Sequence, residues 1–200
     1  MTIQAAIVRE AHYWLGGGPM RYGQVRPVPL GAIKAHKPNT TDCSGSITGI
    51  FYTAGAPDPN GGDYSRTELM YTGTLIHAGA SIPIAKLMPA DLVIYSVGGT
   101  TVHAALVIDA GLDPLLFSHG GPDGAAPHDI RLSAESAWHR ANGGATPVGI
   151  RPNLSAQTIV IPKTTITAGD GTVLARTRYP ILWQRKHPRW AGHKQITLRR

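Results

Sequence analysis

Cysteine is almost absent from this chain of 200 residues: only Cys43 is present, and that scarcity excludes two kinds of site. A lone thiol cannot close a disulfide within the chain, and it cannot build a zinc site from several cysteines. Cys43 is therefore a buried filler, a surface thiol or a catalytic nucleophile.

Long apolar runs are also missing, although 42% of the residues are hydrophobic, which is enough for a core. No run approaches the roughly 20 apolar residues that a membrane-spanning helix needs. Residues 1–5 show no basic segment followed by an apolar one, so we expect no signal peptide. The expected place of synthesis is a cytoplasm, and action outside it would need another route of delivery.

Acidic residues are scarce in the last quarter of the chain. Residues 151–200 hold ten Lys and Arg against one acidic residue, Asp170, a balance of +9. Residues 1–150 hold nine against eleven, a balance of −2, and the two together give the net charge of +7. So basic a segment suits an anionic partner such as a wall polymer, a nucleic acid or an acidic protein face. Nucleic acid has only this charge in its favour, and we do not expect it to be the partner.

Helical spacing of apolar residues dominates the first part of the chain. Residues 3–15 and 44–54 show this spacing and are followed by glycines, which predicts two helices. A capping-box pattern at residues 65–68 predicts a third helix that runs to about residue 78. Residues 19–41 hold several prolines and indicate an irregular loop.

The later part of the chain indicates strands. Short β-rich runs predict strands at residues 91–95, 103–108, 115–119 and 148–151, with a helix at 133–142. The turns between the strands are short and favour antiparallel neighbours. Helices first and strands later is the α+β pattern, with N-terminal helices packed on a central antiparallel sheet.

The C-terminal part is predicted to be a separate extension. Residues 158–161 and 164–167 resemble the two strands of a hairpin, and a basic tail with interleaved aromatic residues follows. The expected organisation is one domain of residues 1–152 and a basic extension of residues 153–200, for docking or wall binding.

The surroundings of Cys43 favour a nucleophile. The cysteine stands at the start of the second predicted helix, where unpaired backbone N–H groups and the helix dipole favour thiolate over thiol. Asp42 before it is better explained as a helix cap than as a catalytic acid.

Two histidines on predicted strands supply a base and an orienting group for such a thiol. His103 opens one strand and His119 ends the next, so pairing of the two strands would make them cross-strand neighbours at one sheet edge. His128 in the following loop competes with His119 for this role. Four further histidines, His12, His36, His77 and His139, are most simply surface or helix-face residues.

These motifs together resemble the NlpC family of papain-like cell-wall cysteine peptidases, in particular short phage-encoded members. The resemblance rests on Asp42–Gly45 opening a helix, on Pro89–Tyr95 as a strand and on the strand led by His103, and it spans roughly residues 3–150. It implies a papain-like NlpC fold. One departure is Ala90, which stands where the family has glycine.

The resemblance also implies roles for particular residues. Cys43 would be the nucleophile, His103 the base and His119 the orienting residue. Substrate and oxyanion contacts would come from Tyr22, Ser44 and Gln24, although Gln24 stands where the family has a second glycine. No metal and no cofactor is implied.

The function implied is peptidoglycan hydrolysis by a thiol endopeptidase that cuts stem peptides, with the D-glutamyl-diamino acid bond as the family's usual target. A phage would carry such an enzyme in the virion tail, where the basic extension would dock it to other tail proteins, or would release it from the host cytoplasm at lysis. The alternatives are a CHAP-like amidase and a phage tail structural protein that keeps a vestigial peptidase fold. A related lipid-acting type is disfavoured because its histidine precedes its cysteine.

Overall fold

The protein is described by a computed structural model, which covers residues 1–121, 124–155, 164–167, 173–177 and 197–199. The chain divides into two compact units, Met1–Ala156 and Gln157–Arg200, and the boundary predicted from the sequence lay at residue 152. Among the described helices, none combines the length and the apolar character that a bilayer crossing requires.

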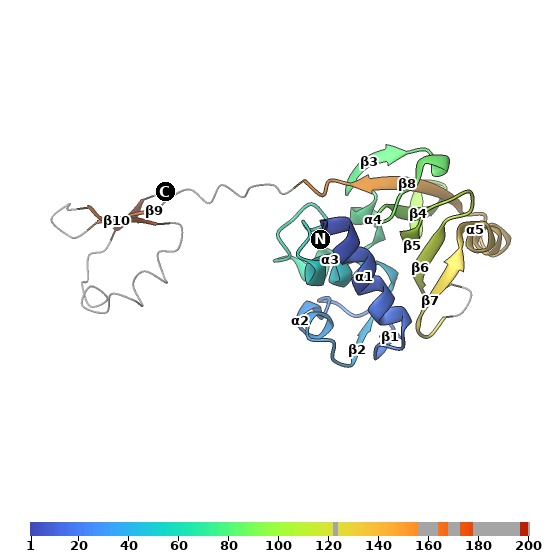
Figure 1. The fold of residues 1–200 in the computed structure, drawn as a ribbon, viewed down its shortest axis with the longest axis horizontal. Coiled ribbons are helices and arrows are strands. Elements are labelled where there is room, and N and C mark those ends of the chain that lie inside the picture. Colours follow the sequence, from blue (N-terminus) through green and yellow to red (C-terminus); the bar gives the residue numbers. More distant parts are fainter. Residues whose placement is uncertain (122–123, 156–163, 168–172, 178–196, 200) are drawn as a thin grey trace. The chain divides into compact units, whose positions relative to one another are not determined.

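A six-stranded antiparallel sheet forms the centre of the first unit, with the strand order β3-β8-β4-β5-β6-β7 (Figure 1). Its strands are β3 (Gly79–Ile82), β4 (Leu92–Val97), β5 (Thr100–Asp109), β6 (Leu115–His119), β7 (Pro127–Arg131) and β8 (Thr146–Pro152). The predicted α+β class, with helices on a central antiparallel sheet, is confirmed.

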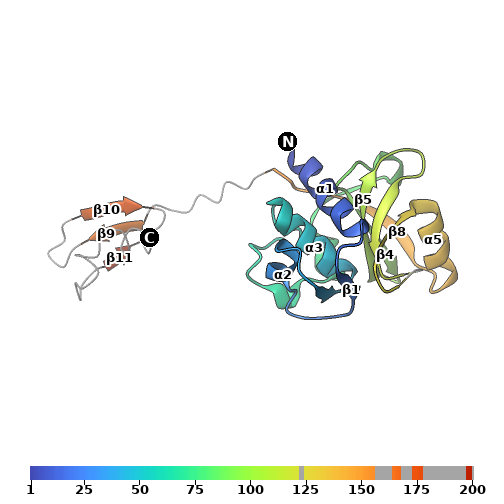
Figure 2. The same cartoon turned by 60° about the horizontal axis from the view of Figure 1, so that its bottom comes forward.

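Helices cover both faces of this sheet. The helices α1 (Ile3–Leu15) and α3 (Cys43–Ala54) lie on one side of β4 and β5, and α5 (Leu132–Ala141) lies on the other (Figure 2). Alternate residues of β5 serve the two layers, as the twofold repeat of a strand requires. Leu106 and Ile108 join the core with α1 and α3, while Ala105 and Val107 join the core with Leu132 of α5.

The third predicted helix is wrong. Residues 65–78 form two short helical pieces instead, η1 (Thr67–Leu69) and α4 (Thr72–Leu75). Gly73 and several β-branched residues lower the helix propensity of this stretch, and Thr74 Oγ1 accepts a hydrogen bond from the Tyr71 backbone N–H at 3.1 Å, which starts a new turn. The strand β3 follows at once.

The loop predicted at residues 19–41 contains short elements. They are β1 (Met20–Tyr22), α2 (Leu30–Lys34) and β2 (Asn39–Thr41), and β1 pairs with β2 in parallel. His36, after α2, contacts Glu10 of α1 through Nε2 and Oε1 at 2.8 Å, and its ring stacks on Tyr13. These contacts fix the segment to α1, and β2 then leads directly into α3. Strands β3 and β7 and the short helix η2 (Ile84–Lys86) had no sequence prediction either.

The second unit contains a small antiparallel sheet with the order β10-β9-β11. Its strands are β9 (Thr164–Thr167), β10 (Val173–Thr177) and β11 (Thr197–Arg199). The second strand of the predicted hairpin matches β9, which pairs with β10 and β11. The first strand of that hairpin, at residues 158–161, and the aromatic residues of the tail lie outside the described residues.

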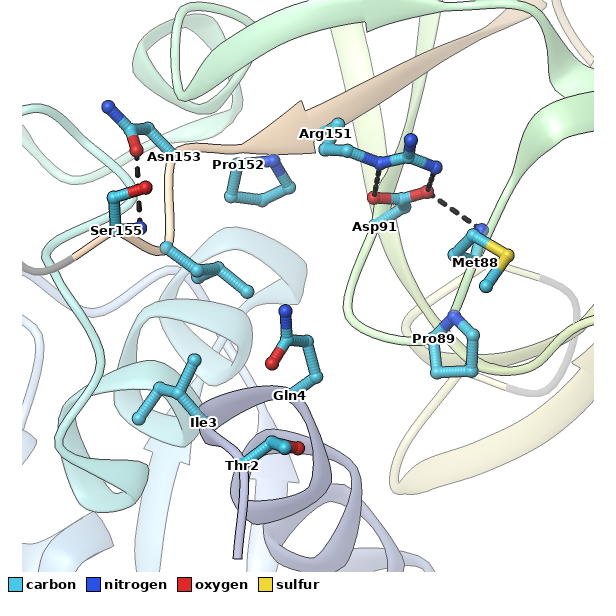
Figure 3. A pocket seen from close by; sticks show the side chains of 11 residues that line it. Thr2, Ile3, Gln4, Met88, Pro89, Asp91, Arg151, Pro152, Asn153 and Ser155 are labelled. Carbon is cyan, nitrogen blue, oxygen red and sulfur yellow. Dashed lines mark hydrogen bonds and ion pairs between the residues drawn. The ribbon is translucent and has the colours of Figure 1, made fainter.

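A tight turn into β4 holds Ala90 in the left-handed region of backbone conformation, with φ of 74°. The turn is held by Asp91, whose carboxylate accepts hydrogen bonds from the Met88 backbone N–H at 2.7 Å and from Arg151 at 3.0 and 2.8 Å (Figure 3). Left-handed backbone costs a residue with a Cβ about 1–2 kcal/mol. Ala90, which stands where the family that the motifs resemble has glycine, therefore has a strained backbone conformation.

We expect Ala90→Gly to raise the free energy of unfolding by about 0.5 kcal/mol, because relief of the left-handed strain exceeds the loss of one buried methyl group. Ala105→Gly is the matched control, since Ala105 is equally buried but lies in an ordinary strand. That control should lose about 1–2 kcal/mol. Urea unfolding of both variants checks the pair, and equal destabilisation would contradict the strain at Ala90.

Candidate functional site

The start of α3 places Cys43 at the edge of a cleft. Asp42 caps the helix: its Oδ1 accepts hydrogen bonds from the Gly45 backbone N–H at 2.8 Å and from the Ser44 hydroxyl at 2.9 Å. Arg26 pairs with the other carboxylate oxygen at 2.8 Å. This confirms the interpretation of Asp42 as a cap and leaves Cys43 as the first residue of the helix.

Gly45 is required by the close approach of Thr41. A Cβ at position 45 would overlap the Thr41 hydroxyl oxygen, which is buried against the first turn of α3. The pattern of residues 42–45 is thus explained physically: a cap, the thiol, a hydroxyl that supports the cap, and a residue without a side chain.

His103 faces the thiol of Cys43 from β5. Burial alone would raise the pKa of Cys43, but the charge of the neighbouring His103 imidazolium outweighs it and lowers the thiol pKa below its usual value. Burial alone would lower the pKa of His103, but the Cys43 charge and the Glu135 carboxylate outweigh it and raise that pKa to about 10. The favoured state of the pair is therefore a thiolate beside an imidazolium.

Behind His103 lies a buried carboxylate that holds its ring. His103 Nε2 lies 2.9 Å from Ser118 Oγ and 3.1 Å from Glu135 Oε1, and the Ser118 hydroxyl donates to the same carboxylate oxygen. Glu135 belongs to α5 and has no exposed surface. Burial would raise its pKa, yet the hydrogen bond and charge of His103 lower it below the usual value. Because Nε2 is engaged here, Nδ1 is the ring nitrogen left for the thiol.

The expected contact between His103 and His119 is wrong, because the two side chains belong to opposite faces of the sheet. Strand β5 pairs with β6 so that Leu106 is opposite Phe117 and Val107 is opposite Leu116. If this register is extended by one residue along β6, Ser118 lies on the face of the sheet that carries His103. If it is extended by two residues, His119 lies on the opposite face. Ser118 therefore occupies the place that was predicted for His119.

His119 is instead buried beneath Tyr22. The two rings meet edge to face, with centroids 5.4 Å apart. Neither ring nitrogen of His119 has a hydrogen-bond partner among the described residues, and burial lowers its pKa to about 4. A neutral histidine in this position supports the Tyr22 ring from below.

The cleft at Cys43 has a volume of about 540 Å³. The competing residue His128 lies on β7 and is not among the residues that line the cleft. The lining comes from the loop after β1, the start of α3, the η1–α4 segment and the start of β5: Tyr22, Gln24, Arg26, Asp42, Cys43, Ser44, Glu68, Tyr71, Thr72, Thr100, Thr101 and Val102.

Of the three predicted contact residues, two have polar atoms available in this cleft. Tyr22 is 41% exposed, and burial together with the Cys43 charge raises the pKa of its phenol, so that it stays protonated. Gln24 lies beside this phenol and acts in the opposite direction, since it lowers the phenol pKa. The Ser44 hydroxyl, by contrast, donates to Asp42 and accepts from Arg26 at 3.1 Å. Its proton is thus directed into the helix cap and not toward an oxyanion.

A second, separate pocket of about 870 Å³ lies between the start of α1 and the end of β8 (Figure 3). It shares no lining residue with the cleft at Cys43. Its charged pair, Asp91 and Arg151, is mutually neutralised. We see no chemical function for this pocket.

Among the described residues, His103, Glu135 and His139 bring possible metal-ligand atoms within 4.8 Å of one another. The Glu135 carboxylate is already shared by His103, Ser118 and the Tyr95 hydroxyl, and the His139 ring stacks on Tyr95 with centroids 4.2 Å apart. We assign the cluster to hydrogen bonding and packing. His139 was expected on a surface or helix face, and it is in fact buried.

Sequence reasoning missed Ser118 and Glu135. Ser118 could have been found from strand alternation, had the register of β5 and β6 been known. Glu135 stands 32 positions after His103 in a helix on the far face of the sheet, and an isolated glutamate there carries no local signal.

Comparisons with known proteins give only structural neighbours, since no family profile and no curated protein matches the sequence. The NlpC/p60 domain of the peptidoglycan hydrolase SagA is similar over 74% of this chain and 97% of its own, with 19% identity and a TM-score of 0.49. The peptidoglycan hydrolase RipB of Mycobacterium tuberculosis is similar over 74% of this chain and 64% of its own, with 22% identity and a TM-score of 0.47. RipD of the same organism is described as a non-catalytic NlpC/p60 protein adapted to peptidoglycan binding. It is similar over 76% of this chain and 98% of its own, with 19% identity and a TM-score of 0.46. The chemistry of this chain is decided by its own side chains.

We expect His103→Asn to raise the pKa of Cys43 by about 2 units, because the imidazolium that stabilises the thiolate is removed. His119→Asn is the matched control and should leave that pKa nearly unchanged. The ultraviolet absorbance of the thiolate, followed against pH, measures both variants, and no other cysteine interferes. An equal rise in the two variants would contradict the assignment of His103 as the partner of Cys43.

Proposed function

We propose that this protein is a cysteine peptidase that hydrolyses peptidoglycan stem peptides. The observation that carries the proposal is the series of side-chain contacts from Cys43 through His103 to Glu135, with the thiol on the wall of an open cleft. A nucleophile, a base and a group that orients the base are the components of acyl transfer by a thiol.

The reaction follows from these groups. The Cys43 thiolate attacks the scissile carbonyl carbon, the C–S bond forms, and the electron pair of the C=O bond moves to oxygen. The first backbone N–H groups of α3 have no partner within the helix and can donate to that oxygen, with Tyr22 as a neutral side-chain donor. The C–N bond then breaks as His103 protonates the leaving amine. Water, deprotonated by His103, then attacks the thioester. The Cys43 thiolate leaves, and the thiolate–imidazolium pair is restored.

The shape of the cleft agrees with a peptide substrate. Tyr22, Tyr71 and Val102 are each at least 41% exposed and lie at the same cleft, which gives a substrate an apolar rim to contact. The walls come from four separate segments of the chain. The resemblance of the motifs to the NlpC family selects peptidoglycan as the substrate and the D-glutamyl-diamino acid bond as the point of cleavage.

The context of action is also a proposal. A phage-encoded enzyme would reach the wall either in the virion tail or from the host cytoplasm at lysis, and the basic residues 153–200 would contact wall polymer or another tail protein. A CHAP-like amidase uses the same thiol and imidazole on a different bond. A vestigial tail protein is disfavoured, because an inactive site would not need a buried, fully paired His103.

Digestion of purified peptidoglycan, with fragments identified by mass, tests the activity and the bond together. We expect fragments that end in D-glutamate, and we expect Cys43→Ala to abolish their release while Cys43→Ser leaves a trace. Fragments that lack the whole stem peptide would favour the amidase instead. An active Cys43→Ala variant would overturn the thiol mechanism, and an inactive wild type would favour the structural role.

The Glu135 carboxylate should control the alkaline limit of activity. The active pair exists above the lowered pKa of Cys43 and below the pKa of His103, which is about 10. Glu135→Gln removes a negative charge that raises the pKa of His103, so the alkaline limb should move to lower pH by about 1 unit or more. The dependence of kcat/KM on pH measures this shift.

The control for this experiment separates charge from packing. Glu135→Asp keeps the carboxylate and should keep the alkaline limb close to its original pH, even where the shorter side chain lowers kcat. His139 faces the same carboxylate, but its pKa is lowered to about 4 by burial and by the charge of His103, so it is neutral throughout the range. If Glu135→Gln lost activity equally at all pH values, Glu135 would be a packing residue only.

A further inference from the structure

Thr72 brings a hydroxyl to the catalytic thiol from a segment for which the sequence predicted no chemical role. It is the first residue of α4, it lines the cleft, and its Oγ1 lies 3.8 Å from Cys43 Sγ. The sulfur atom is large, and this separation allows a hydrogen bond between the two atoms. None of the residues predicted from the sequence has this position.

The short α4 segment is attached firmly to the helix that carries Cys43. The Thr74 hydroxyl contacts Asn60 Oδ1 at 2.6 Å, and Asn60 Nδ2 donates to Thr48 Oγ1 at 3.0 Å. Thr48 lies on α3, five residues after the thiol. The distance between Thr72 and Cys43 is therefore set by a side-chain connection between their elements and not by the chance position of a surface loop.

The neighbours of Thr72 limit its movement further. The Tyr71 ring lies against Gly73, where a Cβ would overlap the ring, so the two residues close in on either side of Thr72. Tyr71 remains 53% exposed and forms part of the cleft wall. The Thr72 hydroxyl thus lies in the cleft lining on a short segment whose neighbouring residues are closely packed.

The direction of the hydrogen bond follows from the charge on sulfur. A thiolate has no proton to donate, so the hydroxyl must be the donor whenever the Cys43–His103 pair is charged. The Ala104 backbone N–H is a further donor to the same sulfur. With the His103 ring, three donors therefore face the thiolate, and the Thr72 hydroxyl is the one whose proton can rotate.

We propose that Thr72 is a catalytic donor, which holds the Cys43 sulfur in the resting site and turns to the carbonyl oxygen when charge moves from sulfur to oxygen. The proposal rests on the acyl transfer described above. In that step the C–S bond forms and the C=O electron pair passes to an oxygen two bonds away from sulfur. The Thr72 hydroxyl lines the same cleft as the sulfur, so it can turn to this oxygen, and donors to the oxygen stabilise the transition state.

The test uses Thr72→Val, which keeps the shape and removes the hydroxyl, and Thr72→Ser, which keeps the hydroxyl. We expect Thr72→Val to raise the pKa of Cys43 by about 0.5–1 unit and to lower kcat/KM about 100-fold, with Thr72→Ser close to wild type on both. The other titratable groups near the thiol, namely His103 on β5, Asp42 before α3 and Tyr22 on β1, are unchanged. Thr67→Val, in η1 and outside the cleft lining, is the control for the substitution itself.

The readouts distinguish this proposal from the proposed function. Thiolate absorbance against pH needs no substrate, and p-nitrophenyl acetate reports acyl transfer to Cys43 without peptidoglycan. A shifted thiol pKa and a slow ester reaction in Thr72→Val would support the donor role even if the wild type left peptidoglycan intact. An unchanged pKa and rate in Thr72→Val, or a loss that Thr72→Ser does not restore, would overturn it.

Discussion

The site depends on one buried arrangement of charge, in which the His103 imidazolium lies between the Cys43 thiolate and the Glu135 carboxylate. All three side chains are buried, and isolated charges in such surroundings are costly. They are tolerated because each charge faces an opposite one and because Ser118 satisfies the carboxylate as well. The arrangement requires α3, β5 and α5 to pack correctly at the same time, so the chemistry of the site is inseparable from the layers of the fold.

The central sheet determines which group His103 can reach. Alternate residues of β5 face different helices, and a shift of one residue in register would exchange the two sets. In the observed register His103 shares its face with Ser118, while His119 lies on the other side beneath Tyr22. A carboxylate on α5 can therefore hold the His103 ring from one side of the sheet while α3 places the Cys43 thiol at its start.

Much of this could be predicted from the sequence, and the failures have physical causes. The helices at residues 3–15 and 43–54 follow from apolar spacing and capping, and Cys43 and His103 follow from the motifs around them. The role predicted for His119 was wrong because it depended on the register of two strands, which includes a bulge between Val107 and Asp109. Glu135 had no local signal at all, because only tertiary packing brings α5 to the back of His103.

The position of Arg26 explains how a capping carboxylate can stand next to a thiolate. Asp42 caps α3 through its carboxylate, yet the charge of that carboxylate raises the pKa of Cys43. Arg26 pairs with Asp42 at 2.8 Å and also donates to Ser44, so the cap is partly neutralised where it faces the cleft. Arg26 belongs to the long segment between β1 and β2, which the sequence indicated only as a loop. That segment thus contributes to the charge balance at Cys43 as well as to the shape of the cleft, since without Arg26 the Asp42 charge would act unopposed on the thiol.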